Sequence, residues 1–269
     1  ESQFKTYRAA ALAARGKPVV IRTLDLGGDK NLSLMKMDSK EENPFMGYRA
    51  IRFCLDHRDI FLTQLRAILR ASAYGKVKIL LPMISSIREV EKSKLLIEQA
   101  KEELTKASLP FDKNIELGVM IEVPGAALTT DVIAAECDFI SIGTNDLIQY
   151  LLAVDRVNDL VANLYEPTHT AVIRTLNMVV SYACKAGIPV SVCGELAADP
   201  IFAPLLLGMG VTEFSMSAKS VSEIKFLLRK VPFAKARALR DEILTLNRSR
   251  HIASRLRSFH YEALERFLK

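Results

Sequence analysis

Six short apolar runs, each followed by a helix-like segment, limit the possible folds more than any other feature of this sequence. They are Val19–Leu26, Val77–Ile84, Leu117–Val123, Phe139–Ile142, Pro189–Cys193 and Glu213–Met216. Nearly continuous apolar runs of this length are typical of strands buried on both faces of a parallel sheet. The repeated alternation predicts an α/β protein, either an open doubly wound sheet or a closed (β/α)8 barrel.

The positions of the polar residues favour the barrel. No GxGxxG sequence follows the first strand, so a dinucleotide-binding open sheet is unsupported. Polar side chains gather instead after the carboxyl ends of several strands, where TIM-type barrels carry their active sites. We therefore expect residues 1–269 to form one domain, a (β/α)8 TIM-type barrel with about six strand–helix units visible. Because the chain begins with a helix-like segment, we expect the first units to lie upstream, in a larger multidomain protein.

Two of the predicted helices carry a capping box at their start. These boxes pair Ser86 with Glu89 and Ser220 with Glu223. In such a box each side chain satisfies a free backbone amide of the first helical turn. We therefore expect a helix to begin directly after each serine.

The composition excludes several classes of protein. With 49% hydrophobic and 25% charged residues the chain is an ordinary globular one, and no apolar run approaches the roughly 18–20 residues of a membrane-spanning helix. The net charge is +6, which suits a small, multiply charged anion, but aromatic residues are not interleaved with basic ones as in nucleic-acid binders. The four cysteines form no CxxC pair, so we expect reduced thiols in a cytoplasmic protein.

The stretch Phe139–Arg156 combines a buried strand, a polar turn and a helix. The strand breaks at Gly143, the polar residues Thr144, Asn145 and Asp146 follow, and an apolar-periodic helix continues to the end of the stretch. This arrangement puts an amide, a carboxylate and a helix N-terminus at one point. Such a point can hold a metal ion and a phosphate.

Glu122 and Asp146 are candidate ligands of a divalent cation. Glu122 lies near the end of the predicted strand Leu117–Val123, and Asp146 comes at the end of the next strand, one strand–helix unit later. Neighbouring parallel strands lie about 4.8 Å apart. Mg²⁺ is usually held by two carboxylates, with water and substrate oxygens in the other positions. The alternative is that each carboxylate pairs with a nearby arginine.

Arg22 and Cys193 also belong to predicted strands. An unpaired guanidinium in an apolar run is strongly unfavourable, so Arg22 must meet either a carboxylate such as Asp25 or a bound anion. Cys193 precedes Gly194 and has no neighbouring histidine in the sequence, which favours a neutral thiol that donates a proton over a nucleophile. A buried structural cysteine is the alternative.

Four further residues allow more than one interpretation. Arg49 follows a Pro-Phe-x-Gly turn and Arg156 closes the polar stretch, and each is either a surface residue or a substrate contact. His169 lies near a helix start, where we expect a cap or core role. Lys30 is expected to be solvated.

Together these segments resemble the phosphoenolpyruvate-binding barrel of Enzyme I of the bacterial phosphoenolpyruvate:sugar phosphotransferase system. The matching segments are RTLDLGGDK (22–30), EENPFMGYRAIR (41–52), QLRAILRASAYG (64–75), GVMIEVPGAAL (118–128), FISIGTNDLIQYLLAVDR (139–156), CGELAADP (193–200) and LLLGMGVTEFSMSA (205–218). Pyruvate phosphate dikinase and phosphoenolpyruvate synthase have similar GTND and CGE segments. The continuation LIQYLLAVDR and the segment NPFMGYRAIR look more like Enzyme I.

The resemblance implies a role for each candidate residue. Glu122 and Asp146 match the Mg²⁺ ligands, and Cys193 matches the proton donor to the methylene carbon. The residues that match the family's substrate-binding positions are Arg22, Arg49, Asn145, Asp146 and Arg156. The resemblance also implies a homodimer. It further implies that the phosphoryl group passes to a histidine on a separate N-terminal domain and then to the carrier protein HPr, and that pyruvate is released.

The sequence departs from the family in two respects. The family's first two barrel units, which carry another phosphate-binding arginine, are missing. The glycine-rich segment around the phospho-accepting histidine is absent, and none of the four histidines lies in such a segment. We therefore expect that the chain does not complete phosphotransfer alone.

The alternatives to the Enzyme I function are a domain like those of the dikinase or the synthase, a Mg²⁺-dependent pyruvate aldolase, and a non-catalytic phosphoenolpyruvate sensor.

Overall fold

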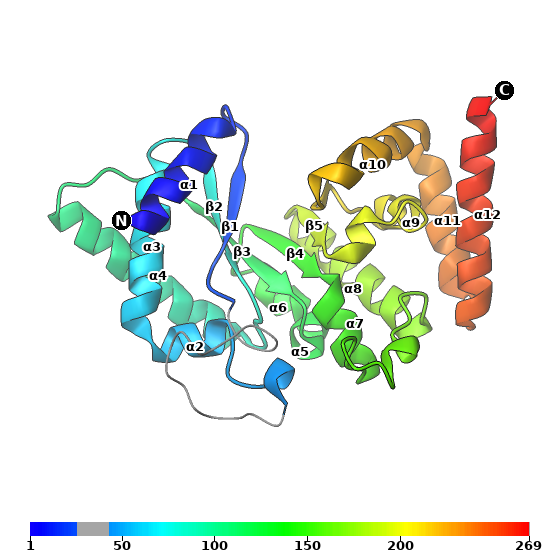
Figure 1. Ribbon diagram of the computed structural model, residues 1–269, viewed down its shortest axis with the longest axis horizontal. Coiled ribbons are helices and arrows are strands. Elements are labelled where there is room, and N and C mark those ends of the chain that lie inside the picture. The colour runs from blue at the N-terminus through cyan, green and yellow to red at the C-terminus, as the bar shows by residue number, and fades with distance from the viewer. Residues whose placement is uncertain (26–42, 269) are drawn as a thin grey trace. The chain divides into compact units, whose positions relative to one another are not determined.

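A computed structural model describes residues 1–25 and 43–268, with side chains up to residue 263 (Figure 1). The chain divides into two compact units. Unit 1 comprises Glu1–Met120 and Glu136–Asp138, and unit 2 comprises Ile121–Ala135 and Phe139–Lys269. Each unit is described by itself.

All six predicted strands are confirmed. They are β1 (Val19–Arg22), β2 (Val77–Leu81), β3 (Glu116–Ile121), β4 (Phe139–Gly143), β5 (Val190–Cys193) and β6 (Glu213–Phe214). The strand order is β1-β2-β3 in one part of the chain and β4-β5-β6 in the other, and in both parts it follows the order of the sequence. The first strand is shorter than expected. It ends at Arg22, whereas the predicted strand extended to Leu26, which lies outside the described part of the chain.

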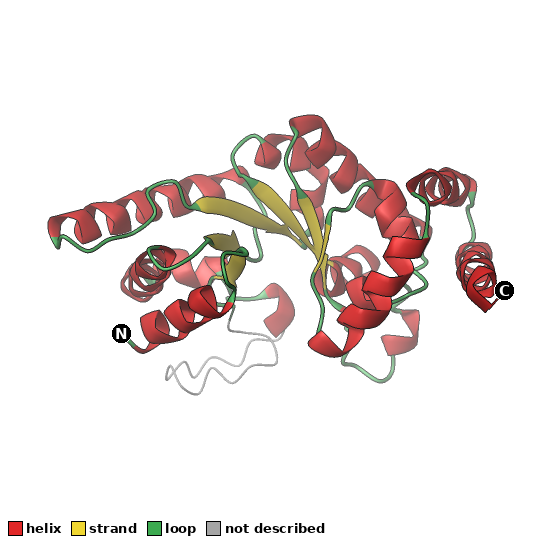
Figure 2. Cartoon of the chain, turned by 90° about the horizontal axis from the view of Figure 1, so that it is seen from above, coloured by secondary structure: helices red, strands yellow, loops and turns green. Residues whose placement is uncertain are grey.

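These strands and the helices between them confirm a parallel α/β fold (Figure 2). Every residue of β4 is buried, as are all residues of β3 except the first, which agrees with strands covered on both faces. The closed eight-unit barrel and the upstream units stay predictions. In the described residues, no helix is both long enough and apolar enough to span a membrane.

Unit 1 packs its helices around β1, β2 and β3. Its helical segments are α1 (Ser2–Ala13), η2 (Pro44–Met46), α2 (Ile51–Asp56), α3 (Arg58–Ser72) and α4 (Ile87–Lys106). The parallel register pairs Arg22 with Leu80, and Leu81 with Val119. Helix α1 lies on α3, where Phe4 joins a buried cluster on that helix, so the N-terminal segment belongs to the core of this unit.

One of the two predicted capping boxes is confirmed. Ser86 is the N-cap of α4, and the Glu89 carboxylate accepts a hydrogen bond from the Ser86 amide at 3.0 Å. The second prediction was wrong, because α10 begins at Ala218 after Ser217, and Ser220 therefore lies inside the helix. The earlier serine takes the N-cap position in extended backbone, which the sequence pattern alone did not distinguish.

Unit 2 contains the remaining strands and helices. Its helical segments are α5 (Pro124–Leu128), α6 (Thr130–Ala134), α7 (Thr144–Leu152), η3 (Ala162–Leu164), α8 (Thr170–Ala186), η4 (Glu195–Ala198), α9 (Ala203–Met209), α10 (Ala218–Lys230), α11 (Phe233–Thr245) and α12 (Ser249–Leu268). The parallel register pairs Gly143 with Cys193 and Val192 with Phe214. Strands β4 and β5 therefore end side by side, and the segments that follow them begin at the same edge.

Helices α9 and α11 approach each other closely at Gly208. A β-carbon on this residue would lie 2.0 Å from the carbonyl oxygen of Ala236 on α11. No side chain fits at that distance, so only glycine allows the two helices to pack as they do.

We expect the substitution Gly208→Ala to lower the stability of the chain. Overpacking of this kind destabilises a protein by about 1–3 kcal/mol, whereas alanine in an open helix is more stable than glycine by about 1 kcal/mol. Chemical denaturation monitored by circular dichroism measures the free energy of unfolding. An unchanged or increased free energy would contradict the close packing of α9 on α11.

Candidate functional site

The turns after β4 and β5 are held together by two hydrogen bonds. The hydroxyl of Thr144 donates to the carbonyl oxygen of Cys193 at 2.8 Å, and the Asn145 side-chain oxygen accepts a hydrogen bond from the Glu195 amide at 3.0 Å. Thr144 is fully buried, whereas Asn145 is partly exposed. The amide predicted to touch a phosphate is therefore fixed in place by the neighbouring turn.

Gly194 makes this contact between the turns possible. Its φ of +93° lies in the region that favours glycine. A β-carbon at this position would lie 2.6 Å from Thr144 Oγ1 and 2.7 Å from Asn145 Oδ1. The glycine therefore lets the turn after β5 approach the first turn of α7.

Asp146 and Arg156 lie at one place although they are ten residues apart in the sequence. Asp146 is buried in the first turn of α7, and Arg156 Nη2 lies 3.9 Å from its Oδ1 atom. The backbone amide of Arg156 donates to Gln149 Oε1 at 3.2 Å, which fixes the segment after the helix. Helix α7 ends earlier than expected, at Leu152, because Ala153 adopts the left-handed conformation and turns the chain back.

Glu122 is the second candidate metal ligand. It follows β3 directly, is buried with 3% of its surface exposed, and precedes α5, which packs against α7. Two buried carboxylates of one unit suit a hard cation such as Mg²⁺, which takes oxygen ligands. In the described residues no group of three or more His, Cys, Asp or Glu gathers to hold a metal. A cation here would therefore need oxygen atoms from water and substrate as well.

Cys193 carries a thiol within reach of oxygen atoms. Its Sγ atom donates to the carbonyl of Ile142 at 3.4 Å, and the hydroxyl of Ser141 donates to the same sulfur at 3.5 Å. The residue is partly exposed, and none of the four cysteines, all of which lie in the described residues, forms a disulfide bond. These contacts fit a thiol that donates a proton, and a structural cysteine would make the same contacts.

Tyr165 is a residue of this site that the sequence reasoning missed. Its hydroxyl donates to the carbonyl oxygen of Asn145 at 3.4 Å. Burial raises the pKa of this phenol to about 12, Arg156 opposes the increase, and Glu195 and Asp146 add to it. Tyr165 therefore lies among the candidate residues. No sequence pattern indicates this, because the contact depends on the fold of the segment after α7.

The two candidate arginines of unit 1 share a carboxylate. Arg49 contacts Asp25 through Nη2 at 3.0 Å and 3.2 Å and through Nε at 3.3 Å. Arg22 Nη1 lies 3.2 Å from Asp25 Oδ2. The expected ion pair of Arg22 with Asp25 is therefore present. An anion remains open as a further partner, because 43% of the Arg22 side chain is exposed.

The other ambiguous residues can now be placed. Arg49 is buried and is therefore not a surface arginine, whereas about a third of the Arg156 side chain is exposed. His169 caps α8, which was one of its two expected roles. Its Nδ1 accepts a hydrogen bond from the Ala171 amide at 3.2 Å. Lys30 lies outside the described residues.

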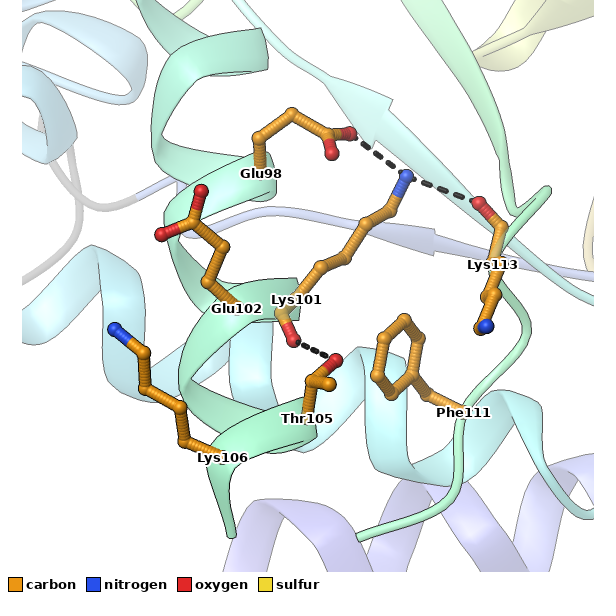
Figure 3. A pocket seen from close by; sticks show the side chains of 7 residues that line it. All are labelled: Glu98, Lys101, Glu102, Thr105, Lys106, Phe111 and Lys113. Carbon is orange, nitrogen blue, oxygen red and sulfur yellow. Dashed lines mark hydrogen bonds and ion pairs between the residues drawn. The ribbon is translucent and has the colours of Figure 1, made fainter. Parts of the chain in front are cut away.

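A pocket of about 380 Å³ lies against α4 (Figure 3). It is lined by Glu98, Lys101, Glu102, Thr105, Lys106, Phe111 and Lys113. The Lys101 ammonium donates to Glu98 and to the Lys113 carbonyl oxygen, so its charge is already paired within the pocket. None of the candidate residues lines this pocket, which borders the segment that leads into β3 and not the segments that follow the strands.

The family is decided by comparison with known proteins. The family described as "PEP-utilising enzyme, PEP-binding domain" matches residues 1–233. This chain belongs to that family. The resemblance to the corresponding domain of Enzyme I is thereby confirmed.

The relatives include several proteins named phosphoenolpyruvate-protein phosphotransferase. The one from Priestia megaterium is 45% identical over 261 residues, which are 97% of this chain and 45% of the relative. The one from Haemophilus influenzae is 49% identical over 244 residues, which are 91% of this chain and 42% of the relative. The chain thus spans less than half the length of these relatives.

A likeness among solved structures is more distant. A citrate lyase from Burkholderia xenovorans LB400 aligns with 79% of this chain and 69% of its own, at 16% identity and a TM-score of 0.49.

We expect the stability of the chain to decrease at alkaline pH because of the Tyr165 phenol. The folded chain keeps this proton up to a pKa of about 12, whereas the unfolded chain releases it near the ordinary value of 10.0. The stabilising contribution is therefore complete below pH 10 and is lost as the pH rises towards 12.

Denaturant unfolding between pH 9 and 11.5, compared with Tyr165→Phe, measures this effect. Burial, followed by a hydrogen bond with Asp56, also raises the pKa of Tyr48 to about 12, so the variant should keep part of the dependence. An identical pH dependence in both proteins would contradict the partly buried position of Tyr165.

Proposed function

We propose that this chain binds phosphoenolpyruvate with Mg²⁺ and supplies the phosphoryl group for the first step of a phosphotransferase system. Together with a separate histidine-bearing N-terminal domain, it would pass the phosphoryl group to that histidine and then to HPr, and release pyruvate. The names of its relatives and the match to the phosphoenolpyruvate-binding family support this proposal.

The single structural observation that carries the proposal is the pairing of Gly143 with Cys193. Because β4 and β5 end at the same level, Asn145, Asp146 and the Cys193 thiol belong to adjoining segments of one unit. An amide, a carboxylate and a thiol at one edge of a sheet provide a phosphate contact, a cation ligand and a proton. Transfer of a phosphoryl group from an enol ester requires all three.

The charges of the substrate account for the arginines. Phosphoenolpyruvate carries a phosphate and a carboxylate, and a guanidinium can bind either group through two parallel hydrogen bonds. We assign Arg22, Arg49 and Arg156 to these contacts and Asn145 to the phosphoryl oxygens. Glu122 and Asp146 would hold Mg²⁺, which neutralises charge on the phosphoryl group as it transfers.

The chemistry itself needs one proton from the chain. The bond between phosphorus and the enol oxygen breaks, a bond from phosphorus to the histidine nitrogen forms, and the enolate of pyruvate leaves. The Cys193 thiol gives its proton to the methylene carbon of the enolate, so that the product departs as the ketone. Solvent then returns a proton to the thiolate.

The homodimer stays a prediction, as does the cytoplasmic location. The proposed partners are phosphoenolpyruvate, the histidine domain and HPr, and neither nucleic acid nor a membrane is among them. Because the relatives are more than twice as long as the aligned segment, the histidine domain would be supplied from outside residues 1–269.

We expect Glu122→Gln and Asp146→Asn each to abolish the Mg²⁺-dependent part of phosphoenolpyruvate binding. Both changes keep the size of the side chain but remove the negative charge that a hard cation requires. Isothermal titration calorimetry with and without Mg²⁺ should show at least a tenfold loss of affinity, which is about 1.4 kcal/mol.

The matched control is Glu213→Gln on β6, an exposed carboxylate of the same unit, which should leave binding unchanged. Unchanged Mg²⁺-dependent affinity in either of the two test variants would refute its assignment as a metal ligand.

We expect Cys193→Ala to retain phosphoenolpyruvate binding and to lower turnover. Loss of a proton donor typically slows a reaction by about 10²–10⁴-fold. The measurement is pyruvate release in the presence of Mg²⁺, the histidine domain and HPr. Cys184→Ala, at an exposed cysteine of α8, is the control. Collapse of binding in Cys193→Ala would assign this residue a structural role instead.

A further inference from the structure

Asp25 lies between the two candidate arginines of unit 1. Its carboxylate accepts hydrogen bonds from Arg49 through both Nε and Nη2, and Arg22 Nη1 contacts its second oxygen at 3.2 Å. Only 4% of the Asp25 side chain is exposed. A single buried carboxylate therefore fixes the position of two guanidinium groups that come from different segments of the chain.

The net charge of Asp25 and the two arginines favours the binding of an anion. Two guanidinium groups and one carboxylate carry a net charge of +1. Without the carboxylate the two cations would repel each other, and the buried Arg49 would have lost a compensating charge. Arg22 contacts Asp25 through one terminal nitrogen, and its side chain is 43% exposed. Because the side chain is this exposed, an anion can reach it while Asp25 holds Nη1 of the guanidinium.

The backbone on both sides of the ion pairs is constrained. The Leu24 amide, directly before Asp25, donates to the buried side chain of Gln64 at 2.8 Å. Ala50, directly after Arg49, has a φ of +52°, which is strained for a residue with a side chain. The chain thus holds Asp25 and Arg49 in fixed places, as the preorganised binding of a rigid dianion or trianion requires.

We propose that Asp25 is a positioning residue that holds the guanidinium groups of Arg22 and Arg49 at the separation at which they bind the anionic groups of the substrate. This inference rests on the proposed function and adds to it a residue without a direct contact to the substrate. A purely structural ion pair would contribute to stability alone, whereas a positioning residue sets the affinity for the anion.

Three variants test this role by calorimetric titration of the full chain with phosphoenolpyruvate and Mg²⁺. Asp25→Asn removes the charge, and we expect at least tenfold weaker binding. Asp25→Glu keeps the compensating charge for the buried Arg49 but displaces the carboxylate, and we expect weaker binding with a melting temperature close to the unsubstituted value. Glu116→Gln breaks the 2.7 Å ion pair with Lys78 in the same unit and should leave the affinity unchanged.

A double-substitution cycle separates positioning from stability. If Asp25 acts through Arg22, its substitution should matter less once Arg22 is gone. The factor by which Asp25→Asn lowers the affinity should then be at least threefold smaller in an Arg22→Gln background than in the unsubstituted chain. Additive effects of the two substitutions, or unchanged affinity in Asp25→Glu, would overturn the inference. Because Asp25→Glu retains the charge, it tests the role even if Asp25→Asn does not fold.

The outcomes also separate this inference from the proposed function. Failure of the unsubstituted chain to bind phosphoenolpyruvate would refute the proposed function and the inference with it. Normal binding by the unsubstituted chain, combined with normal binding by both Asp25 variants, would refute the inference alone.

Discussion

The hydrogen bond from Thr144 to the Cys193 carbonyl is the contact on which the candidate site of unit 2 depends. It joins the ends of two parallel strands whose register pairs Gly143 with Cys193. A shift of the register by one residue would turn every side chain of a strand to the opposite face. The Cys193 side chain would then point to the opposite face of the sheet. The chemistry of this site therefore depends on strand pairing before it depends on any reactive side chain.

Much of the fold could be predicted because the signals are local. The six strands appear in the sequence as apolar runs, and the capping box at Ser86 needs only residues within one helical turn. The prediction at Ser220 was wrong for the same reason, because the serine at residue 217 competes for the cap and the local pattern cannot rank the two. No linker composition marks the boundary between the two compact units, and the prediction that residues 1–269 form one domain stays a prediction.

The candidate site was predictable only in part. Glu122 follows β3 directly, Cys193 is the last residue of β5, and Asp146 lies in the first turn of the helix after β4. Inspection of the strand ends in the sequence therefore finds all three. Asn145 was found as part of a polar turn, but its contact with Glu195 depends on the neighbouring strand. Tyr165 could not be found in this way, because the segment that carries it belongs to no strand end. The role of Asp25 is a similar case, since only the fold brings Arg49 to the carboxylate that Arg22 already contacts.

Gly194 limits how the site of unit 2 can change in evolution. A side chain at this position would displace Thr144 and Asn145 together, so the position allows no gradual replacement. Neighbouring residues on the exposed ends of the turns have no such restriction. New substrate preferences would therefore be selected by substitutions around this glycine, while the junction of the two turns is inherited unaltered. In laboratory evolution, codon 194 would best be kept constant while the surrounding codons are randomised.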